Sequence, residues 1–265
     1  MNISFATYNI WFDNYEQVNR ASHVILEILG TKPKISVISL HEVTRHILDF
    51  IKKSPLSEYY IIPESQTIYN YDTIIIVLKN FKIEKLIIQP FSNTRMSRNL
   101  KIITLSLTSN GKKINVLVAS AHLESEFKIK NPNLYKMDQL SETFSILDTL
   151  IKENPNKYDI VIFMGDTNII SKEQKVFDEI IPVDWKDYFI EFGSPKVLEY
   201  TYDHTKNNNV RIPVNSRLDR LYFKNLSDIF EPYSFAFLGQ EPSRNNLFQS
   251  DHFGILATFE LKNLL

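Results

Sequence analysis

The sequence has no cysteine, only 6 glycines, no long apolar run and no large excess of one charge. The lack of cysteine excludes disulfides, cysteine-ligated zinc sites and a thiol nucleophile, so any metal must be held by oxygen or imidazole. A net charge of −1 excludes a generally basic surface, so contacts with nucleic acid must be local. No run reaches the roughly 18 apolar residues of a membrane helix, and the first residues are typical of a strand, not of a signal peptide. We expect an intracellular protein, nuclear or cytoplasmic, without membrane association.

A chain of 265 residues, 43% of them hydrophobic and with no linker-like tract, predicts one domain over 1–265. Hydrophobic periodicity predicts helices over 18–29, 44–53, 134–151 and 171–180. It predicts strands over 3–8, 35–40, 59–62, 73–78, 82–88, 100–107, 114–121, 160–164, 217–223, 235–238 and 253–259. Asn110-Gly111 predicts a tight hairpin. One sheet does not comfortably hold so many strands, so we expect two stacked sheets with helices outside.

Five apolar runs end on residues that can bind a metal, bind a phosphate or move a proton. Asn9 follows the run 3–8, Glu42 follows 35–40, and His122 follows 114–121. Asp166 and Asn168 follow 160–164, and Asp251 and His252 follow 247–250. A polar residue after one strand is ordinary. Acids, amides and imidazoles after several strands are better explained if those strands deliver side chains to one pocket. The pattern predicts a metal-assisted phosphodiester hydrolase.

Single motifs leave alternatives open. Gly165 permits a sharp turn, after which Asp166 could position or deprotonate water and Asn168 could donate to a phosphate oxygen. The same residues are equally typical of a turn that bonds only its own backbone. Glu42 could bind Mg²⁺, which needs few protein carboxylates, or could open a solvated helix. His41 is interpreted as a packing or surface residue.

The histidine motifs are open in the same way. His122 could donate to a phosphate oxygen, with Ser125 adding a hydroxyl donor, or could be held by local hydrogen bonds without a catalytic role. Glu124 is expected to face the same side as His122 if the strand continues. His252 needs a partner that fixes its tautomer, and Asp219 is the best candidate, unless Asp219 only forms a surface ion pair.

Taken together, the motifs resemble those of the endonuclease/exonuclease/phosphatase superfamily of magnesium-dependent phosphohydrolases. They occur in the superfamily's order: Thr7-Tyr8-Asn9, His41-Glu42-Val43, His122-Leu123-Glu124-Ser125, Gly165-Asp166-Thr167-Asn168, Asp219-Arg220 and Ser250-Asp251-His252. Within it, the chain is most similar to the tyrosyl-DNA phosphodiesterase 2 family, through Pro90 to Leu100, His122 to Ser125, and Tyr200 to Asp203 with Asn208. The resemblance runs from the first strand to the last, and we expect no ubiquitin-associated domain in front.

This resemblance implies a four-layer α/β sandwich, two stacked mixed sheets flanked by helices, with the site at one end of the sheets. It implies hydrolysis of the 5′-phosphotyrosyl bond between a tyrosine of a topoisomerase adduct and single-stranded DNA, or alternatively RNA, leaving a 5′-phosphate. The implied cofactor is Mg²⁺, with Mn²⁺ as a substitute, and the implied form is a monomer. The roles that it implies fall on metal-binding Glu42, Asp251 and Asn9, on Asp166 for water, on Asn168 and His122 for phosphate, and on His252 with Asp219 for the transition state.

Four further residues are expected to bind substrate, namely Ser125, Tyr202, Arg98 and Phe127. Tyr202 matches an aromatic position that stacks on a base, since tyrosine has the required π-face. Two departures from the family remove positive charge, because Ile170 stands where an arginine is usual and Phe127 follows where a basic residue is common. We therefore expect weaker binding of DNA and a shallower salt dependence.

Two other functional classes remain as alternatives. The chain could be another phosphohydrolase of the superfamily, such as an abasic-site endonuclease, an RNA deadenylase or an inositol or lipid phosphatase. The segment from Arg95 to Leu100 and the His122 to Ser125 motif argue against this. It could also be a binding module that has lost catalysis, which the presence of every core residue disfavours.

Overall fold

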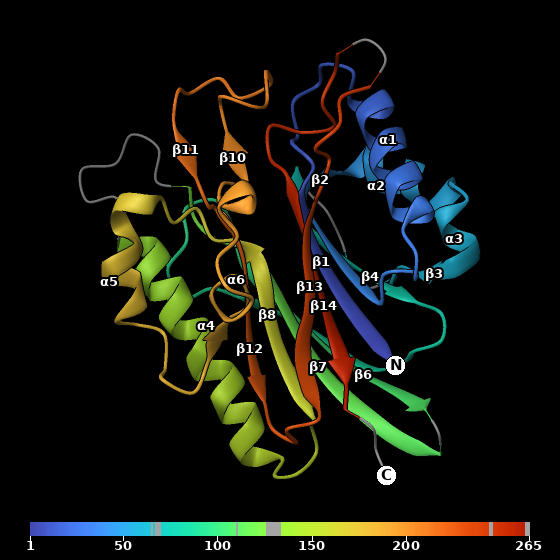
Figure 1. The fold of residues 1–265 in the computed structure, drawn as a ribbon, viewed down its shortest axis with the longest axis vertical. Coiled ribbons are helices and arrows are strands. Elements are labelled where there is room, and N and C mark those ends of the chain that lie inside the picture. The colour runs from blue at the N-terminus through green and yellow to red at the C-terminus, as the bar shows by residue number, and fades with distance from the viewer. Residues whose placement is uncertain (65, 67–69, 110, 126–133, 244–245, 263–265) are drawn as a thin grey trace.

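The computed structural model describes residues 1–64, 66, 70–109, 111–125, 134–243 and 246–262, and it contains two stacked six-stranded sheets (Figure 1). The first sheet has the order β13 (Phe230–Leu238), β14 (Gly254–Leu261), β1 (Asn2–Asn9), β2 (Val37–Thr44), β4 (Tyr71–Leu78) and β3 (Tyr60–Ile61). The second has the order β5 (Lys82–Pro90), β6 (Asn99–Ser109), β7 (Lys112–His122), β8 (Ile160–Asp166), β12 (Asp219–Asn225) and β9 (Lys186–Asp187). Both sheets are mixed, since β1 runs parallel to β2 and β7 parallel to β8 while the other pairs are antiparallel.

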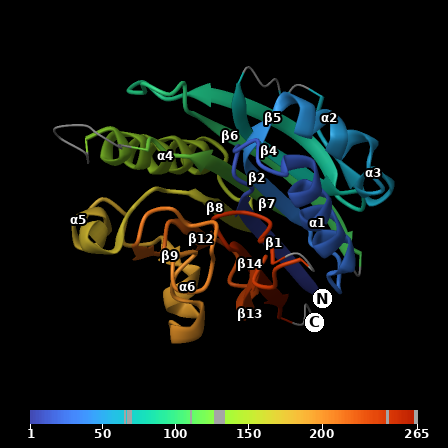
Figure 2. The ribbon, with the colours of Figure 1, turned by 90° about the horizontal axis from the view of Figure 1, so that it is seen from above.

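Helices cover the outer face of each sheet (Figure 2). The first sheet carries α1 (Gln17–Gly30), α2 (Arg45–Lys53) and α3 (Leu56–Tyr59), and the second carries α4 (Leu134–Glu153) and α5 (Gln174–Asp178). A short ribbon of β10 (Tyr202–Asp203) and β11 (Asn215–Ser216) follows α6 (Tyr188–Glu191) and the 3₁₀ turn Lys196–Leu198. The predicted four-layer α/β sandwich is confirmed.

The two central strands, β1 and β8, are buried along almost their whole length, because each packs on both faces. In β1, Ile3 and Phe5 pack between the sheets, while Ala6 and Tyr8 pack under the helices. In β8, Ile160, Ile162 and Met164 pack between the sheets, and Phe163 packs under α4. The inter-sheet core takes residues from both halves of the chain, and one domain over 1–265 stays a prediction.

Strand direction brings the polar residues of the five motifs to one edge. β1, β2, β7 and β8 end there, whereas β12 and β14 run antiparallel to β8 and β1 and begin there. The apolar run 247–250, which we treated as a strand end, forms a loop that leads into β14. Asp251 and His252 reach the edge because the antiparallel strand starts beside the end of β1.

The remaining elements agree with the sequence except for short ones. β6 and β7 pair as far as Ser109 and Lys112, so the hairpin is confirmed, although Asn110 lies outside the described residues. The sequence did not predict α3, α6, β9, β10 or β11, which are two to four residues long. Among the described residues, no helix is long and apolar enough to span a membrane.

Candidate active site

A cavity of about 360 Å³ opens at the edge where β1 and β8 end. Most of the residues predicted for the site line it, namely Asn9, Glu42, His122, Ser125, Asp166, Asn168, Tyr202 and His252. Asp219 is fully buried and contacts His252, while Arg98 is buried and contacts His122. Phe127 lies outside the described residues.

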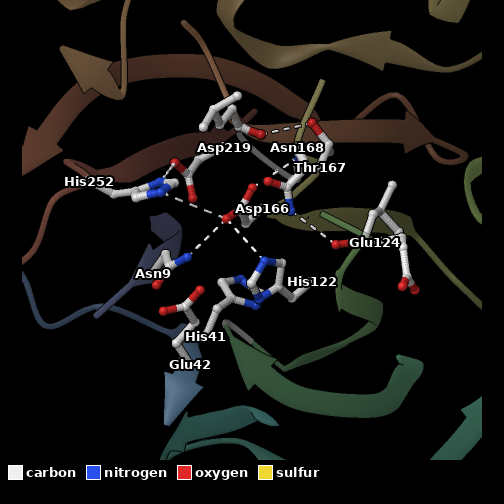
Figure 3. A network of polar contacts seen from close by, with 12 residues as sticks. Asn9, His41, Glu42, His122, Glu124, Asp166, Thr167, Asn168, Asp219 and His252 are labelled. Atoms are coloured by element: carbon white, nitrogen blue, oxygen red, sulfur yellow. Dashed lines mark hydrogen bonds and ion pairs between the residues drawn. The ribbon is translucent and has the colours of Figure 1, made fainter. Parts of the chain in front are cut away.

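Asp166 is the centre of the polar network (Figure 3). Its Oδ2 accepts a hydrogen bond from Asn9 Nδ2 at 2.9 Å and lies 3.3 Å from His122 Nε2 and 3.9 Å from His252 Nε2. Burial alone would raise the pKa of Asp166, but the two histidines and the bonds donated by Asn9 and the Asn168 amide hold it below its usual value. The buried carboxylate therefore stays ionised, as a group that orients water requires.

Asn168 forms the turn bonded to its own backbone that the sequence left open as one alternative, and its role towards phosphate stays a prediction. Its backbone N–H donates to Asp166 Oδ1 at 2.9 Å, as in an Asx turn, while Asp166 Oδ2 remains directed at the network. Asn168 has φ 53°, which asparagine tolerates, and its Nδ2 donates to Leu123 O at 3.0 Å. Gly165 does not make the turn that we expected. It lies inside β8, where a Cβ would sit 1.9 Å from Ala121 O, so glycine is needed for the close approach of β7.

His122 is held by Arg98 on one side and Asp166 on the other. Arg98 Nη1 lies 3.0 Å from His122 Nδ1. Since a guanidinium only donates, Nδ1 must carry the lone pair and the ring proton lies on Nε2, facing Asp166. The longer 3.4 Å contact from Arg98 Nη2 to Nε2 is then no second hydrogen bond. Burial and the charge of Arg98 lower the pKa of His122 well below its usual value, so the ring is neutral.

Arg98 does not line the cavity, although we expected it to bind substrate. We predicted a substrate-binding residue, but the side chain is 6% exposed, faces His122, and lies 5.3 Å from the centre of the Tyr71 ring. The sequence showed a basic residue in a basic segment and could not show that the segment folds back onto β7.

His252 contacts an anion, whereas His122 contacts a cation. Its Nδ1 lies 2.7 Å from Asp219 Oδ2, which confirms the predicted contact and excludes a surface ion pair for the fully buried Asp219. Thr201 Oγ1 accepts from the backbone N–H of Asp219 at 3.1 Å. Burial alone would lower the pKa of His252, but Asp219 and Asp166 together raise it well above its usual value. Tyr202 packs its ring against the imidazole, with the centroids 5.2 Å apart and the planes at 67°.

Glu42 reaches the cavity through a β-bulge. The register of β2 against β4 shifts between Leu40 and Val43, and Glu42 has φ 59°, a conformation unusual for glutamate. The bulge redirects the side chain to the site edge, where Oε2 accepts from Phe12 N at 2.9 Å. Burial and the nearby Asp251 charge raise the pKa of Glu42 to about 7. His41, by contrast, is a core residue between Thr7 and Thr73.

Two groups of side chains could hold a cation. Among the described residues, Asp166, Asp219 and His252 offer ligand atoms within 4.8 Å of one another. However, His252 Nδ1 is already bonded to Asp219, and a protonated imidazole has no lone pair for a metal. Glu42 and Asp251 are the better pair, because the charge of Asp251 disfavours the charge of Glu42 and a bound cation would offset this.

Several supporting residues were missed or misplaced by the sequence. Glu124 does not face the side of His122, because β7 ends at His122 and the alternation stops there. Its carboxylate instead accepts from Thr94 Oγ1 at 2.9 Å and from Arg95 N at 3.2 Å, which anchors the segment before Arg98.

Lys136 was also missed. It lies on the buried face of α4, forms an ion pair with Glu173 at 2.8 Å, and donates to Asn168 O at 3.0 Å. Its spacing to Leu140, Thr143 and Leu147 matches one helix face, and this signal was available in the sequence. The cavity also has an apolar wall that we did not predict, made of Ile212, Val214 and Leu218 with Ile170.

Comparison with known proteins gives the family. No protein-family model matches the chain. Tyrosyl-DNA phosphodiesterase 2 of Rattus norvegicus is 31% identical to it, and the match covers 98% of this chain and 67% of the rat protein. The protein of the same name from Bos taurus is 31% identical over 97% of this chain and 68% of its own length. The chain belongs to the tyrosyl-DNA phosphodiesterase 2 family. It spans about two thirds of the length of these two family members.

Solved structures of family members have the same fold. Truncated Caenorhabditis elegans TDP2 matches with a TM-score of 0.82 and 28% identity, over 98% of this chain and 97% of that one. D. rerio TDP2 in complex with a single-strand DNA product matches with a TM-score of 0.81 and 26% identity, over 98% and 99% of the two chains. An endonuclease/exonuclease/phosphatase family protein of Bacteroides thetaiotaomicron, 15% identical with a TM-score of 0.71 over 99% of each chain, shares the fold alone.

Proposed function

We propose that this chain is a phosphodiester hydrolase that cleaves the 5′-phosphotyrosyl bond between a tyrosine adduct and single-stranded DNA, leaving a 5′-phosphate. The observation that carries the proposal is the ionised Asp166, placed between a neutral His122 and a cationic His252 at the bottom of the cavity. Membership of the tyrosyl-DNA phosphodiesterase 2 family supports the choice of bond. The D. rerio family member in complex with a single-strand DNA product supports the choice of nucleic acid.

In the proposed step, Asp166 orients a water and draws its proton while the water oxygen bonds to phosphorus. The bond from phosphorus to the tyrosine oxygen breaks, and the phenolate leaves with the electron pair. Its pKa of about 10 makes it a good leaving group that needs no strong acid. The Nε2–H groups of His122 and His252 donate to the phosphate oxygens, and Asn9 and Asn168 hold Asp166 in place.

The fit of the site to a divalent cation rests on Glu42 and Asp251. Two neighbouring carboxylates withdrawn from water favour a hard cation with oxygen ligands, and the backbone bond from Phe12 fixes the direction of Glu42. We propose that they hold Mg²⁺, with Mn²⁺ as a substitute, and that Asn9 lies beside it. When bound, the ion would supply Lewis-acid stabilisation of the charge that develops on the phosphate.

The apolar wall supports the proposal that the nucleotide part of the substrate binds on this side of the cavity. Tyr202, Ile212 and Val214 line one side of the cavity, with Ile212 and Val214 about two-fifths exposed, and offer apolar surface to a base. At the same rim, the exposed Lys172 can contact a phosphate, and Ser125 adds a hydroxyl. DNA is the proposed substrate, with RNA as the second candidate, because these groups do not read the 2′ position. We propose a monomer, since one chain supplies every group named.

The test compares three substrates with Mg²⁺ and with EDTA: a 5′-phosphotyrosyl oligonucleotide, an abasic duplex and an inositol phosphate. We expect cleavage of the first only, and only with Mg²⁺. Cleavage of the abasic duplex with the tyrosyl oligonucleotide left intact would contradict the proposal. We also expect Asp166→Asn and His252→Ala to abolish turnover in folded protein, as checked by circular dichroism. Near-normal turnover in either variant would refute the role given to that residue.

A further inference from the structure

A second cavity lies beside the loop that follows β8. Its volume is about 260 Å³, and its lining comes from the 3₁₀ turn Ser171–Glu173, α5, α6, β12 and the residues just before β10 and β12. Arg217 and Arg220 are buried within it, whereas Ser171 is exposed, so the cavity is open to solvent at one end. Sites for drug-sized ligands have volumes of roughly 300–1,000 Å³, so this cavity fits a smaller ligand.

Arg220 is 1% exposed in this cavity, and one of its donors is unused. Its Nε donates to Thr167 Oγ1 at 3.2 Å and its Nη2 donates to Ile169 O at 3.2 Å. Within the described part of the chain, Nη1 has no hydrogen-bond partner. Asp187 Oδ2 lies 3.9 Å away, which is an ion-pair distance but too long for a hydrogen bond. A buried guanidinium N–H without an acceptor is costly, and a bound ligand atom would satisfy it.

The carboxylate nearby is already used by the other arginine. Arg217 Nη1 lies 2.9 Å from Asp187 Oδ1 and 2.7 Å from Oδ2. One carboxylate thus lies between two guanidinium groups. Burial lowers the pKa of Arg220, and the charge of Arg217 lowers it further, against the opposite effect of Asp187. An anion beside Nη1 would offset both the burial and the repulsion.

The second cavity and the active-site cavity lie on opposite sides of one wall. Ser171 lines the second cavity, while the residues on either side of it line the active-site cavity. On β12, Asp219 contacts His252 in the active site, and the next residue, Arg220, lines the second cavity, as neighbours on a strand point to opposite faces. Because Arg220 also holds the loop after β8, a ligand on it would contact the residue that supports this loop from behind.

We propose that the second cavity binds a phosphate group, at a site separate from the active-site cavity. Guanidinium N–H groups and phosphate oxygens form short, charge-assisted hydrogen bonds, and the Ser171 hydroxyl offers a further donor at the mouth. Glu199 also lines the cavity and opposes an anion, so the affinity depends on the balance between Arg220 and Glu199. The phosphate is either free inorganic phosphate or a phosphate further along a bound nucleic-acid strand. This inference goes beyond the proposed function, which uses the active-site cavity alone.

The first experiment measures the Kd for inorganic phosphate by titration calorimetry, without Mg²⁺ and at constant ionic strength. Ser171→Glu places a negative charge at the exposed mouth of the cavity, and Ser171→Gln is the matched control of the same size without the charge. We expect Ser171→Glu to weaken phosphate binding by about fivefold or more through like-charge repulsion, and Ser171→Gln to stay within about twofold of wild type. A wild-type chain that binds no phosphate, or an equal Kd in the two variants, would overturn the inference.

Glu199→Gln tests the same site in the opposite direction. It removes the opposing carboxylate, so we expect phosphate to bind about two- to fivefold more tightly than in wild type. Glu199 lines the second cavity and not the active-site cavity, so phosphate held in the active site would keep its affinity in this variant. An unchanged Kd in Glu199→Gln would therefore refute the second site. Loss of folding is checked in each variant by a thermal melt.

A last comparison identifies the source of the phosphate. It measures the Kd of a 5′-phosphorylated dinucleotide and of a longer 5′-phosphorylated oligonucleotide for wild type and Ser171→Glu. If only the longer strand loses affinity in the variant, a phosphate of the strand occupies the second cavity. If neither strand loses affinity while inorganic phosphate does, the ligand is the free anion. An equal loss for both strands would overturn the inference, because the charge would then act on the active-site cavity.

Discussion

Replacing Arg98 with glutamine should slow turnover although Arg98 does not line the cavity. In the structure its guanidinium fixes the lone pair of His122 on Nδ1 and so directs the Nε2 proton at the site. A hydrogen bond from a charged donor contributes about 1.5–3 kcal/mol, which corresponds to roughly 10- to 100-fold in the tautomer equilibrium. We therefore expect kcat to fall roughly 10- to 100-fold while KM changes by less than about threefold.

The loss of Arg98 should also shift the pH dependence of kcat. The guanidinium is one of the causes that hold the pKa of His122 low, so its removal raises that pKa and lets the ring charge at higher pH. The acid limb of kcat should move to higher pH in the variant. An ¹⁵N–¹H correlation of the imidazole groups gives an independent measure, because it separates protonated from unprotonated ring nitrogens.

Arg95→Gln is the matched control, since it removes the same charge from an exposed position in the same segment. It should leave kcat, the pH profile and the His122 tautomer as they are. If Arg98→Gln had the kinetics of wild type, or the same His122 tautomer together with reduced kcat, the reasoning from geometry would be refuted. A thermal melt separates either result from loss of folding.

Three further changes test other parts of the site. Asp219→Asn should lower kcat roughly 10³- to 10⁴-fold, because an amide cannot support cationic His252; activity within tenfold of wild type would contradict this. Lys136→Met should lower the free energy of unfolding by about 3–5 kcal/mol, since it leaves Glu173 buried without its cation; an unchanged urea midpoint would disprove the role of the pair. EDTA should abolish hydrolysis and Mg²⁺ should restore it, and Glu42→Gln should raise the Mg²⁺ concentration needed for half activity; equal requirements in variant and wild type would exclude Glu42 as a ligand.

Residues at strand ends were predictable because two local signals coincide there. An apolar run such as 160–164 indicates a buried strand, and the first polar residue after it must lie at the sheet edge. The direction of the strands then brings Asn9, His122 and Asp166 together. Asp251 and His252 reached the same edge by a different route, since the loop before β14 carries them. Of the two, His252 lines the cavity.

The supporting contacts were not predictable, because they depend on pairing over long sequence distances. Arg98 and His122 are 24 residues apart, and nothing local distinguishes an arginine on a histidine from one on a phosphate. The bulge at Glu42 had no glycine to mark it, so its left-handed backbone appeared only in the structure. The apolar wall comes from a segment without regular periodicity, where sequence patterns carry little information.

The two histidines beside Asp166 acquire opposite charge states from their second contacts. Burial and the cation Arg98 lower the pKa of His122, whereas at His252 the anions Asp219 and Asp166 together outweigh burial and raise the pKa. Environments that push the pKa values of two like groups apart are typical of sites that divide roles between them. In the proposed reaction at neutral pH, one ring would donate a neutral hydrogen bond to the phosphate and the other would contribute a positive charge. Exchange of either partner would remove this difference, so Arg98 and Asp219 matter to the proposed chemistry as much as the residues that line the cavity.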